Sequence, residues 1–113
     1  MRIINFSHLD EKPMRRFNSK RTSIIPILTS VDEIQLVVMN IKPFGVIGMH
    51  KAPADQLVIV AKGEGWVRNE SSDKIILKEG ECVYWQEGED HESGSDNGMI
   101  VYILEGIDFS IKA

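Results

Sequence analysis

Apolar residues recur along the chain in short runs that are bounded by glycine, proline or small polar residues. Because no apolar stripe with a helical period continues beyond about two turns, these runs are typical of strands rather than amphipathic helices. Turn signals such as Pro43 with Gly45 and Asn97 with Gly98 separate the runs, as in a β-sandwich or barrel. The pattern predicts an all-β domain with strands at residues 3–6, 21–28, 34–41, 46–50, 56–61, 65–68, 74–77, 82–85, 99–104 and 108–111.

Two of these runs, at residues 57–60 and 100–104, are apolar at consecutive rather than alternate positions. A strand with water on one face alternates, so we expect both faces of these strands to be covered. One face would line the interior of a barrel, and the other would meet a second sheet or another subunit. Pro26 places its predicted strand at an edge or a bulge. We therefore expect residues 1–34 to form an edge element that pairs across a homodimer, and residues 35–113 to form the barrel.

The composition is that of one soluble globular domain. A chain of 113 residues, 42% of them hydrophobic, can build a core but is short for two domains. No apolar run is long enough to cross a bilayer, and the first residues lack the apolar stretch of a secretory signal. Cys82 is the single cysteine, which excludes an internal disulfide and suits a reducing compartment. We therefore expect a cytoplasmic protein with no membrane partner.

Charge is distributed unevenly between the beginning of the chain and the remainder. Residues 1–21 carry six bases and two acids, a net charge of +4, whereas the remainder carries seven bases and fifteen acids, a net charge of −8. This basic segment lacks the interleaved aromatic residues of a nucleic-acid footprint. It is better explained as a solvated edge that pairs with an acidic body, in the same subunit or a partner subunit. The charge pattern thus predicts no nucleic-acid partner.

Two segments carry the chemistry, and they read GMHKAPADQLVIVAKGEG from residue 48 and GECVYWQEGEDHESG from residue 80. They resemble the two signature motifs of the cupin superfamily, whose members are small antiparallel β-barrels with a site inside. The first motif has the order His, His, Glu, Gly, and its places are filled here by His50, Ala52, Gln56 and Gly63. The second has the order Gly, Pro, Gly, His, and its places are filled by Gly80, Gln86, Gly88 and His91.

The spacing of both motifs is intact, but two of the four expected metal ligands are changed. The resemblance implies a single-domain jelly-roll β-barrel similar to small bacterial cupins with a degenerate metal-binding motif. Ala52 lies two residues after His50, so a methyl group would point where the family has its second imidazole. Gln56 brings a neutral amide instead of a carboxylate. The remaining set of His50, Gln56 and His91 would bind a divalent transition metal such as Fe, Mn, Ni or Zn only weakly.

Other residues near the motifs have two possible roles each. Gln56 offers two donors and an acceptor to a small molecule, or its amide is satisfied by neighbouring backbone. Acidic residues flank His91 and should raise its pKa. Glu92 would supply the missing carboxylate if its loop turned inward; otherwise the segment is a solvated acidic loop at the barrel mouth. Trp85 or Tyr84 would form an aromatic wall of the pocket, and strand parity does not decide between them.

The cupin fold serves dioxygenases, decarboxylases, isomerases, sugar-binding sensors and storage proteins, so the resemblance does not decide function. We predict a protein that binds a small molecule without redox chemistry, in a pocket lined by His50, Gln56, Trp85, His91 and Glu92. The alternative is a metal-dependent enzyme of the dioxygenase or isomerase type that uses His50 and His91 with Gln56 or Glu92. A third hypothesis is an oligomerisation module whose barrel is filled by side chains.

Overall fold

The structure is a computed structural model that describes residues 1–112, and these residues form strands joined by turns, with two single-turn 3-10 helices and no α-helix. The prediction of an all-β fold is confirmed. The elements are β1 (Arg2–Asn5), η1 (Phe6–His8), β2 (Lys12–Pro13), η2 (Arg16–Asn18), β3 (Ser23–Ile24), β4 (Leu28–Thr29), β5 (Ile34–Ile41), β6 (Gly45–Lys51), β7 (Asp55–Arg68), β8 (Ile75–Lys78), β9 (Glu81–Trp85), β10 (Asp90–Ser95), β11 (Met99–Gly106) and β12 (Ser110–Ile111). None of the described helices is long and apolar enough to cross a membrane.

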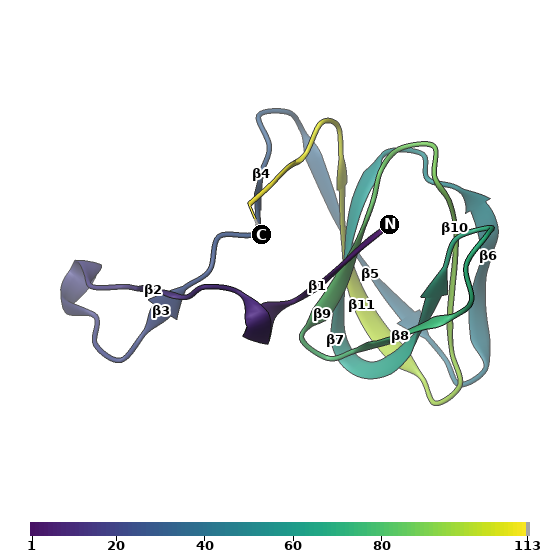
Figure 1. Cartoon of the computed structure of the whole chain (residues 1–113), viewed down its shortest axis with the longest axis horizontal. Coiled ribbons are helices and arrows are strands. Elements are labelled where there is room, and N and C mark those ends of the chain that lie inside the picture. The colour runs from purple at the N-terminus through teal and green to yellow at the C-terminus, as the bar shows by residue number, and fades with distance from the viewer. Residues whose placement is uncertain (113) are drawn as a thin grey trace.

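Two curved antiparallel sheets enclose the barrel, and the long strand β7 belongs to both of them (Figure 1). The first part of β7 pairs with β9 and β11, and these strands pair in turn with β1 and β5. The last part of β7 pairs with β8 and β10, and β10 pairs with β6. This arrangement is a jelly roll, because a single chain supplies both sheets and the connections cross between them.

Glycine allows β7 to pass from one sheet to the other. The sequence predicted two strands, 56–61 and 65–68, where the structure has one strand of 14 residues. Gly63 has a φ of +79°, and the register with β11 shifts between Ile100 and Val101. A side chain at Gly65 would meet the carbonyl oxygen of Gly94 and the side chain of Met99. The absence of a Cβ at both glycines therefore permits the bend and the close approach of neighbouring strands.

The structure corrects two predictions of secondary structure. Residues 90–95, expected as an acidic loop, form β10, which has strand partners on both sides. Their sequence, DHESGS, has low intrinsic β-propensity, so the tertiary pairing of its backbone determines the strand. The predicted strand 21–28 is instead divided into β3 and β4, separated by Pro26, which has no N–H for a ladder.

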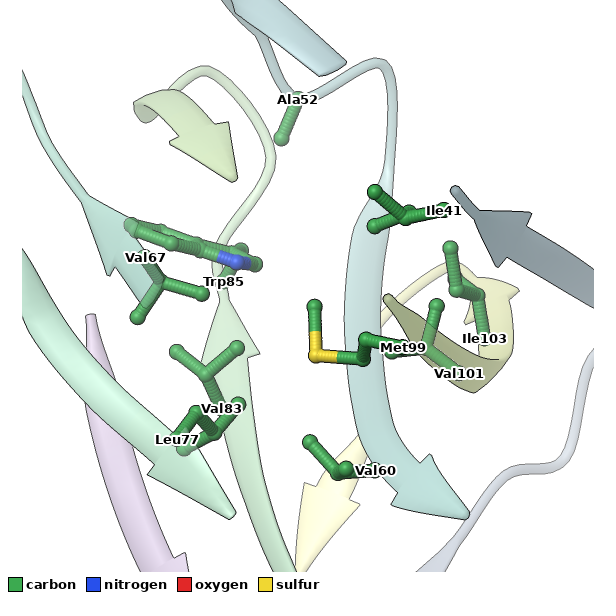
Figure 2. Close-up of a cluster of buried hydrophobic side chains, with 10 residues drawn as sticks. All are labelled: Ile41, Ala52, Val60, Val67, Leu77, Val83, Trp85, Met99, Val101 and Ile103. Atoms are coloured by element: carbon green, nitrogen blue, oxygen red, sulfur yellow. The ribbon is translucent and has the colours of Figure 1, made fainter. Parts of the chain in front are cut away.

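The two faces of the first sheet build separate hydrophobic clusters. Side chains inside the barrel form the larger cluster, seen in Figure 2, which contains Leu77, Val83 and Val101. On the outer face, Leu57 and Cys82 are fully buried beneath segments near both termini, including Phe6 and Ile111. The chain itself therefore covers both faces at Leu57, as predicted for residues 57–60. The same prediction for residues 100–104 is wrong at Tyr102, which is 45% exposed on the outer face of β11.

Residues 10–25, hereafter the N-terminal arm, extend away from the barrel in Figure 1. The radius of gyration of 15.0 Å exceeds the value of about 13 Å expected for a compact chain of this length. Within the arm, β2 and β3 form only a two-residue ladder. Pairing of the N-terminal segment across a homodimer stays a prediction.

Candidate functional site

The barrel interior contains a cavity between the two sheets, with about 510 Å³ of empty space including its open mouth. The part that the centre of a water-sized molecule can reach is about 50 Å³, so the enclosed space of the cavity is narrow. The lining is largely apolar, and its polar members come from four strands and lie toward one end: His50, Gln56, Trp85 and His91, with Ser93 beside them. The structure thus brings four of the five predicted pocket residues to one cavity.

Cross-strand pairing places the two histidines side by side. His50 on β6 is the register partner of His91 on β10, and their ring centroids lie 4.3 Å apart at an interplanar angle of 66°. Nδ1 of His50 lies 2.7 Å from the carbonyl oxygen of Gly48. Because a carbonyl only accepts, Nδ1 carries the proton, and in the neutral ring Nε2 is left as an acceptor.

His91 is the buried member of the pair, with 5% of its surface exposed. Its ring stacks on the indole of Trp85 at a centroid distance of 5.1 Å and an angle of 29°. Its Nδ1 is buried and has no hydrogen-bond partner within the described part of the chain. An orphaned buried nitrogen is costly unless a water, a ligand or nearby backbone satisfies it, and the backbone of Glu89 acts on this histidine as a hydrogen-bond partner.

The pKa of His91 is lowered, which contradicts the expectation that the neighbouring acids would raise it. Burial is the largest cause and the adjacent His50 is the second, while Glu89 and Asp90 act in the opposite direction. Both acids are engaged elsewhere: Glu89 with the amino group of Met1 at 2.7 Å, and Asp90 with Lys51 at 3.4 Å. Desolvation therefore outweighs the acidic neighbours, and the neutral imidazole is favoured.

The structure decides which aromatic residue faces the pocket. Trp85 lines the cavity and is 2% exposed. Tyr84 points to the other face, where its hydroxyl donates a hydrogen bond to Asp55 at 3.1 Å. Burial and the bond to Asp55 raise the pKa of Tyr84 to about 12, so the phenol stays protonated at neutral pH.

Gln56 is connected to a carboxylate that the sequence analysis missed. Its Nε2 donates to Oε1 of Glu105 at 2.9 Å, and the two residues are register partners on β7 and β11. The predicted strand 99–104 ended one residue before Glu105, so the pairing was not visible. Gln56 is 8% exposed and also pairs in register with Trp85 on β9.

Glu92 does not line the cavity. Its Oε1 accepts a hydrogen bond from Nε of Arg68 at 2.6 Å, and the two residues are register partners on β10 and β7. The register of β10 with β6 shifts between His91 and Ser93, and Ser93 is the residue that reaches the cavity. The carboxylate of Glu92 is thus paired with Arg68 and does not take the place of the glutamate in the cupin motif.

The residues present do not fit the family's metal site of three imidazoles and a carboxylate. Ala52 is 2% exposed and its methyl group belongs to the interior cluster (Figure 2). Only two imidazoles converge, and the amide of Gln56 is already bonded to Glu105. No group of three or more His, Cys, Asp or Glu side chains among residues 1–112 could hold a metal ion. We therefore derive no chemistry through a metal.

Solved structures share this architecture, although their sequences are distant. A cupin-like protein from Thermotoga maritima aligns with a TM-score of 0.63 and 19% identity, covering 74% of this chain and 71% of its own. A cupin superfamily protein from Desulfitobacterium hafniense aligns with a TM-score of 0.62 and 15% identity, covering 89% of this chain and 99% of its own. The fold is a cupin fold.

A predicted oxalate decarboxylase from Thermotoga maritima shares this cupin fold at a TM-score of 0.55 and 18% identity, covering 61% of this chain and 62% of its own. No protein-family model matches the sequence, and a comparison with curated proteins gives no match. At these identities the likeness concerns the fold alone. The resemblance expected from the motifs is confirmed at that level, and the cavity residues must carry any argument about function.

Proposed function

We propose that this cupin binds a small molecule in its barrel, without a tightly held metal and without redox chemistry. One observation carries the proposal: the two altered motif positions are integrated into the structure around the cavity. Ala52 packs into the interior cluster, and Gln56 is bonded to Glu105. Ala52 has no donor atom, and Gln56 can offer a metal only the neutral oxygen of its amide.

The cavity has the features expected of a binding site for an organic molecule. Apolar side chains such as Met39, Ile47 and Ile103 supply most of the lining, and a few polar groups converge at one end. The empty space between the two sheets favours a bound molecule over an interior that is completely filled by side chains. This observation argues against the oligomerisation module.

A metal-dependent enzyme is the second candidate, because the rings of His50 and His91 lie together in the family's positions. Two histidines and one carboxylate form the facial set of non-haem iron enzymes. Here the carboxylate of Glu92 is paired with Arg68, and Glu105 is bonded to Gln56. Neither carboxylate lines the cavity, so a facial set would require one of them to move toward the two histidines.

The two candidates are separated by metal analysis of protein purified without an affinity tag, followed by titration with Fe(II), Mn(II), Ni(II) and Zn(II). We expect clearly substoichiometric metal and weak uptake. Near-stoichiometric metal in the purified protein would contradict the proposal and support the enzyme.

The double variant Ala52→His with Gln56→Glu is the matched positive control, because it restores the family's ligand set. The buried imidazole should cost about 1–3 kcal/mol of stability through overpacking. A bound metal should offset this cost and raise the melting temperature, since it binds only the folded state. An equal metal-dependent rise in the wild type would show that the native site is already competent.

A further inference from the structure

The polar groups of the cavity are gathered at one end of the barrel by strand register. Gln56 lies between Trp85 and Glu105 in one sheet, and His50 faces His91 in the other. The opposite end of the cavity is lined by apolar side chains that include Leu77 and Met99. A ligand would therefore meet one polar end and one apolar end.

The polar end lacks a free positive charge. Lys, Arg, Asp and Glu are all absent from the described residues that line the cavity. Several cations near this end are each paired with an acid, including the Met1 amino group with Glu89, Lys51 with Asp90 and Arg68 with Glu92. The carboxylate of Glu105, bonded to Gln56, adds negative charge behind this end.

The hydrogen-bonding atoms that remain suit an uncharged partner. Gln56 uses its amide N–H toward Glu105, which leaves its carbonyl oxygen as an acceptor. His50 uses Nδ1 toward Gly48, which leaves Nε2 as an acceptor in the neutral ring. Figure 2 shows the indole nitrogen of Trp85 on the side of the ring that faces Ile41 and Met99 across the interior, where its N–H can donate.

From these observations we infer that the cavity binds an uncharged, mainly apolar small molecule through one polar end and discriminates against carboxylate anions. This inference rests on the proposed function and specifies its ligand class. An anion entering the cavity would lose its hydration without meeting a free cation, and it would lie near Glu105. A neutral amide or alcohol would instead donate to the acceptors of Gln56 and His50.

Benzamide and benzoate test the inference, because they have nearly the same size and shape and differ in charge at pH 7.5. The chain contains two tryptophans, and only Trp85 lines the cavity, so the indole N–H resonance of Trp66 is an internal control. Titration followed by NMR should give a saturable shift of the Trp85 resonance with benzamide. We expect benzoate to bind more weakly by about tenfold or more. The variant Trp66→Phe assigns the two resonances.

A charge placed on the cavity wall should reverse the preference. Met39 on β5 lines the cavity and is 39% exposed, so Met39→Lys would bring an ammonium group to the wall near the mouth. Val38 is its neighbour on the opposite face of the strand and is 60% exposed, which makes Val38→Lys the matched control. We expect Met39→Lys to bind benzoate at least as tightly as benzamide, and Val38→Lys to keep the wild-type preference.

The outcomes separate the inference from the function on which it rests. Benzoate binding to the wild type as tightly as benzamide would overturn the ligand class and leave a small-molecule site. Failure of both compounds to shift Trp85, or equal shifts of Trp85 and Trp66, would overturn the proposed function as well. The wild-type comparison decides the matter even if Met39→Lys fails to fold.

Discussion

The barrel and the N-terminal arm (residues 10–25) contain similar apolar residues with opposite surroundings. In the barrel, Leu57, Leu77 and Val83 are completely buried by other parts of the same chain. In the arm, Phe17 is 84% exposed and Ile24 is 44% exposed. The chain thus covers the core of the barrel, whereas apolar side chains stay exposed in the arm and on the outer face of β5, as at Leu36 and Val38. We propose that such surface in the arm contacts a partner, and the prediction of a homodimer assigns that role to a second copy.

Left-handed backbone conformations occur in both regions, mostly at glycines in the barrel but also at Phe44 and Asp108. The left-handed positions described in β7 and its neighbouring turns include Gly63 and Gly80, which have no Cβ and adopt φ of +79° without strain. In the arm, Phe17 and Arg21 have φ of +60° and +53°. Such a conformation costs about 1–2 kcal/mol for a residue with a Cβ. Because the arm buries little surface to offset this cost, contacts with a second subunit would stabilise it.

The largest effect on the free energy of unfolding should come from the barrel core. Leu57→Ala removes a fully buried side chain and is expected to cost about 2–5 kcal/mol. Leu36→Ala is the control, because Leu36 on β5 is 63% exposed; it should cost less than about 0.5 kcal/mol. Urea denaturation monitored by tryptophan fluorescence measures both. Similar losses in the two variants would contradict the distinction between covered and uncovered apolar surface.

A smaller loss is expected where strands of the barrel approach closely. Gly65→Ala places a methyl group against the carbonyl oxygen of Gly94 and the side chain of Met99, and should cost about 1–3 kcal/mol. Gly48→Ala on β6 is the matched control, because a Cβ there would meet no atom within 4 Å. We expect that variant to be neutral or slightly stabilised in thermal unfolding. A neutral Gly65→Ala would show that the two sheets can separate easily at β7.

The pH dependence of stability should reflect the buried histidine of the barrel, His91. The pKa of His91 in the folded state lies below its ordinary value of 6.5, so as pH falls below 6.5 the unfolded chain binds a proton first. Stability is therefore complete above that pH and falls by up to about 1.4 kcal/mol per pH unit below it, until the folded pKa is reached. Denaturation at pH 7.5, 6.5 and 5.5 measures the slope. His91→Gln should reduce it, and an unchanged slope in that variant would contradict the assignment to His91.

Substitutions in the arm should have the smallest effect on the stability of the barrel and the largest effect on the oligomeric state. We expect the wild type to be a homodimer that buries about 800 Å² or more per subunit. Phe17→Asp with Ile24→Asp should give a monomeric mass at micromolar concentration while the barrel remains folded. Light scattering measures the mass, and Lys20→Asp controls for added negative charge in the arm. A monomeric wild type would contradict the prediction and leave the exposed arm unexplained.

Local sequence determined much of the barrel. The strand predicted at 34–41 has those bounds in the structure, because its apolar run ends at turn residues that no distant contact alters. The spacing of the motifs also predicted that His50 and His91 lie together, and their ring centroids are 4.3 Å apart. These features depend on the periodicity of apolar residues and on the turn residues between them, and both are local properties of the sequence.

Only the tertiary structure decided which side chains line the site and which partners they contact. Several features of the site depend on which residues of distant strands become partners. They are the strand β10, the inward position of Trp85, the pairing of Glu92 with Arg68 and the bond between Gln56 and Glu105. The predicted direction of the pKa shift of His91 was wrong for the same reason, because the pKa is lowered rather than raised. The sequence places acids beside this histidine, whereas folding engages those acids in ion pairs and removes the ring from water. Burial and cross-strand partners are properties of the folded chain as a whole, and they determine the chemistry of a group more strongly than its neighbours in sequence.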